Sequence, residues 1–403
     1  MVASTALRPV GCPSGPAVLD ELLPALAASV AGTGPALVPV PNGAAGAAVL
    51  RMAAVDEPLE QSVAADGTSD PVALVVPTSG STGTPRGVLL TVSALAASAA
   101  ATHSRIGGPG RWLLCLPTTH VAGLQVLLRS ISAGTRPVCQ DLSAGFDADG
   151  FAAAASQLAG RGRRYTSLVP TQLTRLLGDD AARAALQGFD AVLLGGAGAP
   201  EPLLARARRA GVAVVETYGM SETCGGCVYG GTPLAGVSVA LAPDGRIILA
   251  GSVLFAGYRR DPAATGAVLT DGVFTTGDLG ALDSDGRLEV LGRADDVLVT
   301  GGELVSPAAV ERVLTGAGGV ADAVVVGLPD PEWGQRVVAL VVSGPTGASG
   351  ASPDAGRLRA LVADRLGRAS APRDVVAVDA VPLLGIGKPD RAAATRLASR
   401  LLA

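Results

Sequence analysis

The chain has 403 residues and a formal net charge of −4, and 48% of its residues are hydrophobic, 16% charged and 3% aromatic. This composition is typical of a globular chain with cores of Ala, Val and Leu; it excludes a disordered chain and gives no general attraction to nucleic acid. No apolar run reaches the roughly eighteen residues of a membrane helix, and the N-terminus lacks the basic start and apolar block of a signal peptide. We therefore expect a cytoplasmic protein of two domains without a membrane span.

Residues 72–290 repeatedly pair a short apolar run with a helical pattern of Ala, Leu and Arg. Such alternation predicts an α/β domain whose sheets are largely parallel. The expected strands are 72–76, 112–116, 191–194 and 212–215, and the expected helices are 124–132, 171–177 and 202–209. From about residue 237 the runs shorten and are joined by Asp-Gly turns, which predicts an appended antiparallel β region.

A smaller α+β unit is expected in the C-terminal part of the chain. Its elements, in order, are a helix with Ser306 as N-cap and Pro307 at the first position, strands 323–326 and 337–342, a Gly/Ser/Pro loop 344–356, a helix from Arg357 and a strand 375–378. We divide the chain into an N-terminal domain, 1–292, and a C-terminal domain, 293–403.

A loop rich in glycine and hydroxyl groups directly follows the first expected strand. Its residues are Thr78, Ser79, Gly80, Ser81, Thr82, Gly83, Thr84, Pro85, Arg86 and Gly87. Glycines allow backbone N–H groups to turn toward a ligand, hydroxyl groups can donate to phosphate oxygens, and Arg86 adds positive charge. The spacing is not that of a Walker A loop. A flexible Ser/Gly linker is the alternative, but linkers rarely lie between two apolar strands, so we favour a polyphosphate-binding loop.

Lys388 is the only lysine of the chain, in which arginine otherwise supplies the cationic side chains. A compact ammonium group fits between crowded oxygens where a wide, planar guanidinium does not, so this position is a candidate for charge stabilisation. A solvated surface lysine is the alternative.

The five cysteines are scattered and odd in number, which does not indicate a disulfide framework. Cys224 and Cys227 form a lone CxxC, for which small side chains lining a cleft are favoured over a metal or redox role.

The loop at 78–87 resembles the signature loop of the acyl-adenylate-forming ligases, the superfamily of acyl-CoA synthetases, peptide-synthetase adenylation domains and luciferase. Later motifs of that family are matched, in order, by residues 218–222, 276–278, 292–296 and 387–388. Residues 333–335 also resemble part of its C-terminal domain. Ordered motifs across most of a chain are far more specific than any single one.

The resemblance implies roles for particular residues. Those implied to be catalytic are Lys388, Ser221, Glu222 and Arg86, and Glu222 is also implied to hold the metal ion. Those implied to bind the nucleotide are Thr78, Ser79, Gly80, Ser81, Thr82, Gly83, Gly196, Ala197, Gly198, Thr217, Tyr218, Gly219, Met220, Asp278 and Arg293. Those implied to face the acyl substrate are His120, Gly123, Leu124 and Gly195. Asp295 is implied to be the hinge of a mobile C-terminal domain. For His120, a buried histidine satisfied by backbone is the alternative.

The implied reaction has two steps and uses ATP, Mg²⁺ and coenzyme A. A carboxylate attacks the α-phosphorus of Mg-ATP to give acyl-AMP and pyrophosphate, and a thiol then displaces AMP. Lys388 would stabilise the charge that develops between carboxylate and α-phosphate, and rotation about Asp295 would carry it away before thiol attack. No protein nucleophile is needed, which agrees with motifs rich in glycines, hydroxyls and cations.

The segment around His120 narrows the choice of acid substrate. Amino-acid-activating relatives carry an Asp here, and none occurs between Leu116 and Gln140. Residues 120–130 and 168–173 most resemble the o-succinylbenzoate–CoA ligases of menaquinone synthesis, in which case Arg129 or Arg175 could hold a second carboxylate, although arginines on helices are usually solvated. The alternatives are another aryl- or acyl-CoA ligase and a non-catalytic nucleotide-binding homologue.

Two departures from the family pattern stand out. Arg86 occupies a position where lysine is common, which keeps the charge. The phosphate loop begins at Thr78, earlier than in most relatives, so we expect an abbreviated N-terminal subdomain. That side of the acyl pocket and the oligomeric state therefore stay open, with a homodimer as one possibility.

Overall fold

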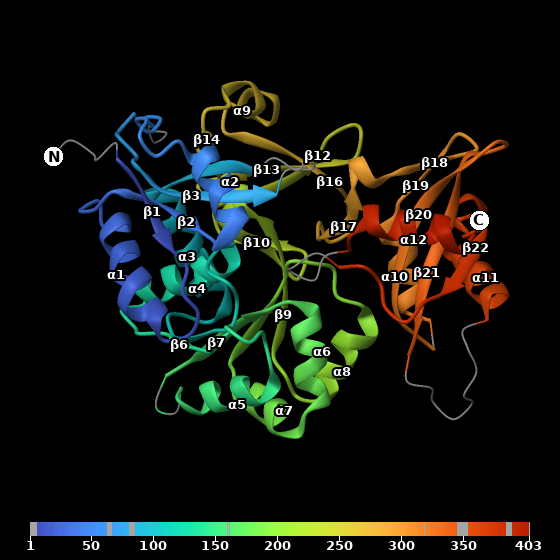
Figure 1. Cartoon of the computed structure of the whole chain (residues 1–403), viewed down its shortest axis with the longest axis horizontal. Helices are drawn as coiled ribbons and strands as arrows, with labels where there is room; N and C mark the ends of the chain where they lie inside the picture. The colour runs from blue at the N-terminus through green and yellow to red at the C-terminus, as the bar shows by residue number, and fades with distance from the viewer. Residues whose placement is uncertain are drawn as a thin grey trace. The chain divides into compact units, whose positions relative to one another are not determined.

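The structure, a computed structural model, describes residues 6–62, 67–79, 85–158, 160, 162–317, 319–344, 354–383 and 389–402. The chain divides into two compact units (Figure 1). Unit 1 comprises Met1–Gly195, Ala207–Ala240 and Ile248–Thr275, and unit 2 comprises Gly196–Arg206, Leu241–Ile247 and Thr276–Ala403. The described helices are α1 (Ala17–Val30), α2 (Gly43–Ala53), α3 (Val92–Ile106), α4 (Val121–Ser132), α5 (Ala148–Ser156), α6 (Pro170–Gly178), α7 (Asp180–Leu186), α8 (Glu201–Arg209), α9 (Pro262–Val268), α10 (Pro307–Thr315), α11 (Ala355–Leu366) and α12 (Arg391–Leu401).

The first sheet of unit 1 carries the ends of the predicted phosphate loop. Its strand order is β1 (Leu7–Gly11), β2 (Ala36–Val40), β3 (Val72–Ser79), β4 (Pro85–Thr91) and β14 (Gly257–Tyr258). Strands β1 to β3 are parallel, whereas β4 is antiparallel to both β3 and β14. Helix α2 packs on this sheet, where its Val49 and Ala53 share a buried cluster with Val75 and Leu89. The hairpin formed by β3 and β4 is thus anchored in a core.

The second sheet of unit 1 is the predicted parallel one. Its order is β11 (Thr232–Pro233), β10 (Gly225–Tyr229), β9 (Val214–Met220), β8 (Ala191–Leu194), β7 (Arg164–Leu168), β5 (Arg111–Leu114) and β6 (Val138–Cys139). The pairs from β9 to β6 are parallel, and β10 turns back antiparallel to β9. Strand β8 is an unbroken apolar run and is buried along its whole length, as expected for a strand covered on both faces.

A third sheet forms the predicted antiparallel β region. Its order is β12 (Val237–Leu241), β13 (Arg246–Gly251), β16 (Val273–Leu282) and β15 (Leu269–Thr270), with β17 (Leu288–Arg293) also paired to β16. Both β15 and β17 are antiparallel to β16. The division between the units runs through this sheet.

The fourth sheet belongs to unit 2 and is covered by helices on both faces (Figure 1). Its order is β19 (Glu303–Val305), β18 (Leu298–Thr300), β21 (Gly334–Ser343) and β20 (Val320–Asp330), with β22 (Asp374–Ala377) also paired to β21. Alternate residues of β20 point to opposite faces, so Val325 packs with α10 and α11 while Val324 and Val326 pack with α12. Ser306 caps α10 by accepting a hydrogen bond from the Ala309 N–H at 3.3 Å, as its sequence position predicts.

The α/β class is confirmed, and most expected elements occur within a few residues of their predicted ends. Helix α4 begins three positions before its predicted start, and β9 extends beyond its predicted end to Met220. Strands β1 and β2 were not predicted. Most of the predicted 344–356 loop lies outside the described residues.

Arg259, which directly follows β14, binds the segment after α2 within unit 1. Its side chain is 1% exposed and donates to the carbonyls of Ala53, Ala54, Glu57 and Pro58 and to the Glu60 carboxylate at 2.9 Å. Removal of a buried donor leaves its carbonyl acceptors unsatisfied, which typically costs about 1–3 kcal/mol. We expect Arg259→Ala to lower the free energy of unfolding of unit 1 by that amount.

Chemical denaturation followed by fluorescence measures this loss. The chain has two tryptophans, of which Trp112 lies in unit 1, so a Trp333→Phe background reports on unit 1 alone. Arg136→Ala is the matched control, because its pair with Asp20 is exposed and should change stability by less than about 1 kcal/mol. Equal losses in the two variants would contradict the anchoring role.

Candidate active site

The β3–β4 hairpin brackets the predicted phosphate loop. Thr78 pairs with Arg86 and Ser79 with Pro85 across the two strands, and the Thr78 hydroxyl donates to the Arg86 carbonyl at 3.4 Å. The predicted binding residues Gly80, Ser81, Thr82 and Gly83 lie outside the described residues. The structure therefore gives the two ends of this loop, joined as neighbouring strands at the edge of a packed core.

The second motif forms a tight turn at the end of β9. Thr217, Tyr218, Gly219 and Met220 close that strand, and Ser221 and Glu222 follow in a short 3-10 turn. The Thr223 hydroxyl accepts from the Met220 N–H at 2.9 Å and donates to the Gly225 carbonyl at 2.7 Å. A Cβ at Gly219 would lie 2.1 Å from the Gly225 carbonyl oxygen, so only glycine allows β10 to return this closely. This turn holds Ser221 and Glu222 at the carboxyl end of a parallel strand.

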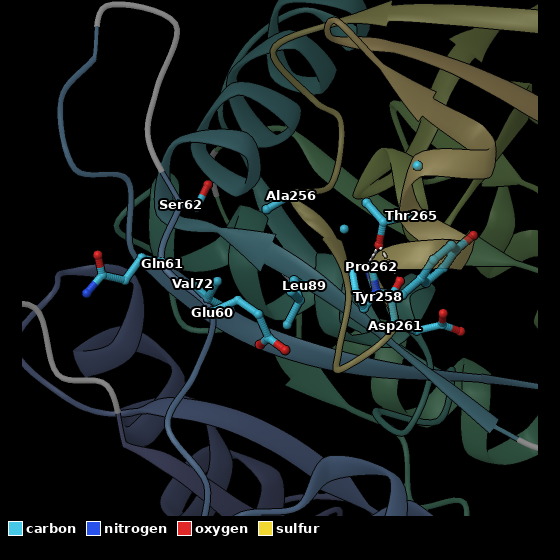
Figure 2. Close-up of a pocket in the computed structure, with 12 residues that line it drawn as sticks. Glu60, Gln61, Ser62, Val72, Leu89, Ala256, Tyr258, Asp261, Pro262 and Thr265 are labelled. Carbon is cyan, nitrogen blue, oxygen red and sulfur yellow. Dashed lines mark hydrogen bonds between the residues drawn. The ribbon is translucent and has the colours of Figure 1, made fainter.

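Tyr258 joins two of the predicted catalytic residues. Its hydroxyl donates to Glu222 Oε1 at 2.9 Å, and the guanidinium carbon of Arg86 lies 5.5 Å from the centre of its ring. Three segments far apart in the sequence therefore meet here. Tyr258 was not predicted, because the sequence marks it only as one of four tyrosines that happens to follow a glycine. It also borders a pocket of about 400 Å³, with Gln61 and Ser62 on the other side (Figure 2).

His120 lies at the start of α4, shortly after β5. It is exposed and occupies the N-cap position, so the alternative of a buried histidine is wrong. Helix α4 is tied to the second motif, because Gln125 Nε2 donates to the Cys224 carbonyl at 2.6 Å. A Cβ at Gly123 would lie 2.3 Å from the Pro117 carbonyl oxygen, so this glycine permits the tight entry into the helix. Leu124 is fully buried. A substrate-facing role for these three residues stays a prediction.

The glycine-rich segment after β8 begins beside the second motif. A Cβ at Gly195 would meet the Thr217 hydroxyl oxygen at 2.5 Å, and that hydroxyl donates to the Leu194 carbonyl at 3.2 Å. Gly196 has a left-handed φ of +82°, which favours glycine. Ala197 and Gly198 follow it in a loop of unit 2.

Asp278 and Arg293 face each other in unit 2. They are register partners across β16 and β17, and Arg293 Nη1 lies 3.5 Å from Asp278 Oδ1. Arg293 Nη2 also lies 3.3 Å from Asp295 Oδ2, which links the pair to the predicted hinge. Gly277 leaves room for this guanidinium, since a Cβ there would lie 2.9 Å from Arg293 Nη2. Two residues predicted to bind the nucleotide are thus neighbours.

Lys388 lies outside the described residues, but the chain on either side of it is fixed. Leu383 and Pro389 form an isolated antiparallel bridge, and the Asp390 N–H donates to the Pro382 carbonyl at 2.9 Å. Arg391 then binds Glu311 through Nη1 at 2.6 Å and Asp296 through Nε at 2.9 Å, beside the predicted hinge residue.

The CxxC cysteines are buried thiols. Cys224 and Cys227 are both 0% exposed, and burial raises the pKa of Cys227 to about 11 and that of Cys224 further. Both thiols are therefore protonated at neutral pH, which argues against a reactive redox pair, and their burial places them in the core rather than in the expected cleft. Among the described residues, no cluster of three or more His, Cys, Asp or Glu side chains could hold a metal ion. In the same residues no helix has the length and apolarity to cross a membrane.

Family models match both parts of the chain: one of AMP-binding enzymes covers residues 21–253, and one of the AMP-binding enzyme C-terminal domain covers residues 309–388. The chain therefore belongs to the AMP-binding enzyme family, and the predicted resemblance is confirmed. Among its relatives is the probable 2-succinylbenzoate–CoA ligase of Mycobacterium tuberculosis, with 48% identity over 392 residues, or 97% of this chain and 98% of the relative. The 2-succinylbenzoate–CoA ligase of Geobacillus kaustophilus is 34% identical, over 83% of this chain and 71% of its own.

Solved structures show the same fold. The amide bond synthetase from Marinactinospora thermotolerans has a TM-score of 0.77 and 27% identity, covering 98% of this chain and 90% of its own. The o-succinylbenzoate CoA synthetase from Bacillus subtilis, in complex with its acyl-adenylate intermediate, has a TM-score of 0.72 and 25% identity. The match covers 97% of this chain and 88% of the synthetase chain.

Proposed function

We propose that this protein is an ATP-dependent acid–CoA ligase that forms an acyl-adenylate and then a thioester, with 2-succinylbenzoate (o-succinylbenzoate) as its acid. The observation that carries the proposal is the 48% identity, along nearly the whole of both chains, to the Mycobacterium tuberculosis relative. The contact of Arg86 and Glu222 with one tyrosine supports it, because two predicted catalytic residues meet. We further propose a cytoplasmic, homodimeric enzyme divided near residue 293.

In the first step a carboxylate oxygen of the acid bonds to the α-phosphorus of ATP, and pyrophosphate leaves. Arg86 and Lys388 would bind the phosphate oxygens, and Asp278 and Arg293 the ribose. Mg²⁺ is commonly bound by one or two carboxylates together with substrate phosphates, which fits the single oriented carboxylate of Glu222. When bound there, the ion neutralises phosphate charge. In the second step the thiolate of coenzyme A bonds to the acyl carbon, AMP leaves, and the thiol proton goes to solvent.

Arg129 is the better candidate to hold the second carboxylate of the acid. Arg129 lies on α4 and is 3% exposed as a residue, so the expectation that helix arginines are solvated is wrong here. Its described partners are the Tyr229 hydroxyl at 3.4 Å and the Trp112 ring at 5.2 Å, and its Nε atom has no hydrogen-bond partner among the residues that the structure describes. Burial lowers the pKa of Arg129, and a buried cation gains most from a paired anion. Arg175, by contrast, is exposed and donates to a backbone carbonyl.

The test is ATP–pyrophosphate exchange on a panel of acids. We expect o-succinylbenzoate to drive exchange at least about tenfold more efficiently than benzoate or octanoate, because removal of the distal carboxylate leaves its partner unpaired, at a cost of roughly 1.4 kcal/mol or more. Equal rates with octanoate would refute o-succinylbenzoate as the preferred substrate, but they would not contradict the adenylation chemistry. Absence of exchange with every acid of the panel would instead support the non-catalytic alternative.

Paired variants of the two arginines locate the specificity. Arg129→Leu should reduce the preference for o-succinylbenzoate over benzoate to less than about threefold, since an apolar side chain of similar size is often tolerated at a buried charge but cannot bind a carboxylate. Arg175→Leu is the matched control and should keep the preference. The reverse pattern would move the role to Arg175.

A further inference from the structure

Tyr258 lies between two charged groups, Arg86 of strand β4 and Glu222 of the 3-10 turn that follows β9. Its side chain is largely buried, with 7% of the residue exposed. The hydroxyl donates to Glu222 Oε1 at 2.9 Å, while the ring lies under the Arg86 guanidinium, with 5.5 Å from Cζ to the ring centre. One side chain therefore contacts both the carboxylate and the cation of the nucleotide site.

The backbone around Tyr258 is fixed on several sides. Strand β14 pairs Tyr258 with Val88 of β4, and the Tyr258 N–H donates to the Thr265 hydroxyl at 2.9 Å, a contact drawn in Figure 2. The Phe255 ring meets the Tyr258 ring edge-on, with 5.0 Å between centres. The Phe255 N–H also donates to the Glu222 carbonyl at 2.9 Å, so the segment that carries the tyrosine is bonded to the turn that carries the glutamate.

These contacts can orient the carboxylate of Glu222. A hydrogen bond at Oε1 restricts rotation of the carboxyl group and so sets the direction of Oε2. A ligand oxygen held in advance lowers the entropy cost of binding a cation, and small misplacements of such oxygens are costly. The phenol is a neutral donor, so it orients the carboxylate without competing for the cation as a lysine or arginine would.

We propose that Tyr258 is a positioning residue for metal-bound nucleotide: its hydroxyl sets the orientation of the Glu222 carboxylate, and its ring supports the Arg86 guanidinium. The inference rests on the proposed function in one respect, namely that Glu222 holds the cation of metal–ATP. It goes beyond the sequence motifs because Tyr258 belongs to none of them.

The two contacts can be separated by substitution. Tyr258→Phe removes the hydroxyl and keeps the ring under Arg86, whereas Tyr258→Leu removes both. Tyr165→Phe is the matched control, because it deletes a buried tyrosine hydroxyl of unit 1 that bonds the backbone carbonyls of Ile106 and Gly108 and the Arg163 side chain, and none of these residues is a predicted site residue.

Electron paramagnetic resonance measures the affinity of the ATP complex for Mn²⁺. This measurement needs no acid substrate. We expect Tyr258→Phe to weaken Mn²⁺ binding in the ATP complex by about tenfold, the size of one hydrogen bond to a charged group, and to leave metal-free ATP binding unchanged. Tyr258→Leu should in addition weaken metal-free ATP binding, because the support of Arg86 is lost. Tyr165→Phe should change neither.

A double-mutant cycle tests whether Tyr258 acts through Glu222. In a Glu222→Gln background the additional effect of Tyr258→Phe on Mn²⁺ binding should fall below about twofold. Unchanged Mn²⁺ binding in Tyr258→Phe, or an equal loss of metal-free ATP binding in that variant, would overturn the positioning role. An enzyme that binds Mn²⁺ and ATP as expected but shows no exchange with any acid would refute the ligase proposal and leave this inference standing.

Discussion

Replacing Lys388 with Ala should reduce adenylate formation by on the order of a thousandfold, the upper range for loss of a group that stabilises transition-state charge. The same variant should still convert synthetic acyl-AMP and coenzyme A into thioester, because the resemblance to the family implies that this lysine serves only the first step. The described residues on either side of Lys388 are held by the bridge between Leu383 and Pro389 and by Arg391, so the substitution should not unfold unit 2. Pyrophosphate exchange measures the first step, and thioester release from acyl-AMP the second.

Two further variants sharpen this prediction. Lys388→Arg should fail nearly as badly as Ala if the compact ammonium is what the site requires, and this chain uses arginine at its other non-histidine cationic positions. Arg400→Ala removes an exposed positive charge from α12 and should be fully active. Full activity of Lys388→Arg would show that the lone lysine is an accident of composition, and loss of both steps in Lys388→Ala would contradict the division of labour.

Replacing Asp295 with Pro should have the opposite pattern, with adenylate formation retained and thioester formation lost. Asp295 lies in a short 3-10 turn, and its exposed carboxylate is paired only loosely with Arg293 at 3.3 Å. Proline restricts rotation both at its own position and at the preceding residue, and a hinge works by absorbing such rotation. The measurements are the same two half-reactions.

Asp295→Ala is the control, because it removes the same carboxylate and leaves the backbone free to rotate. It should support both steps within a few-fold of the unaltered enzyme, since an exposed ion pair contributes little. If Asp295→Pro turned over acyl-AMP as fast as Asp295→Ala, no rotation at this position would be needed for thiol attack.

Local pattern was sufficient to predict much of the fold. The apolar run that became β8, the Ser306 cap of α10 and the Asp-Gly turns of the third sheet all depend on residues adjacent in sequence. Strands β1 and β2 were missed because the pairing of β1 with β2, and of β2 with β3, joins distant segments. The early start of α4 was missed because Gly123 and the polar His120 hide the first helical turn, which is set by the close approach to Pro117.

Contacts between distant segments were also the part of the candidate site that the sequence could not predict. Motifs in the sequence pointed to Glu222, Arg86, Asp278 and Arg293, and the structure brings each pair together. The group that joins the first pair, Tyr258, lies 36 positions from Glu222, and no local pattern reports a contact of that range. Burial of Arg129 was likewise invisible, because a helical arginine has the same sequence signature whether it is solvated or enclosed.

Transfer of an oxygen isotope tests the central claim most directly. The acid is labelled with ¹⁸O in its carboxylates and incubated with the enzyme, ATP, Mg²⁺ and coenzyme A, and the nucleotide product is examined by mass spectrometry. If a carboxylate oxygen attacks the α-phosphorus and the thiol then attacks the acyl carbon, each AMP molecule carries one labelled oxygen when o-succinylbenzoate is the acid. Unlabelled AMP, or label found in inorganic phosphate together with ADP, would contradict an acyl-adenylate intermediate.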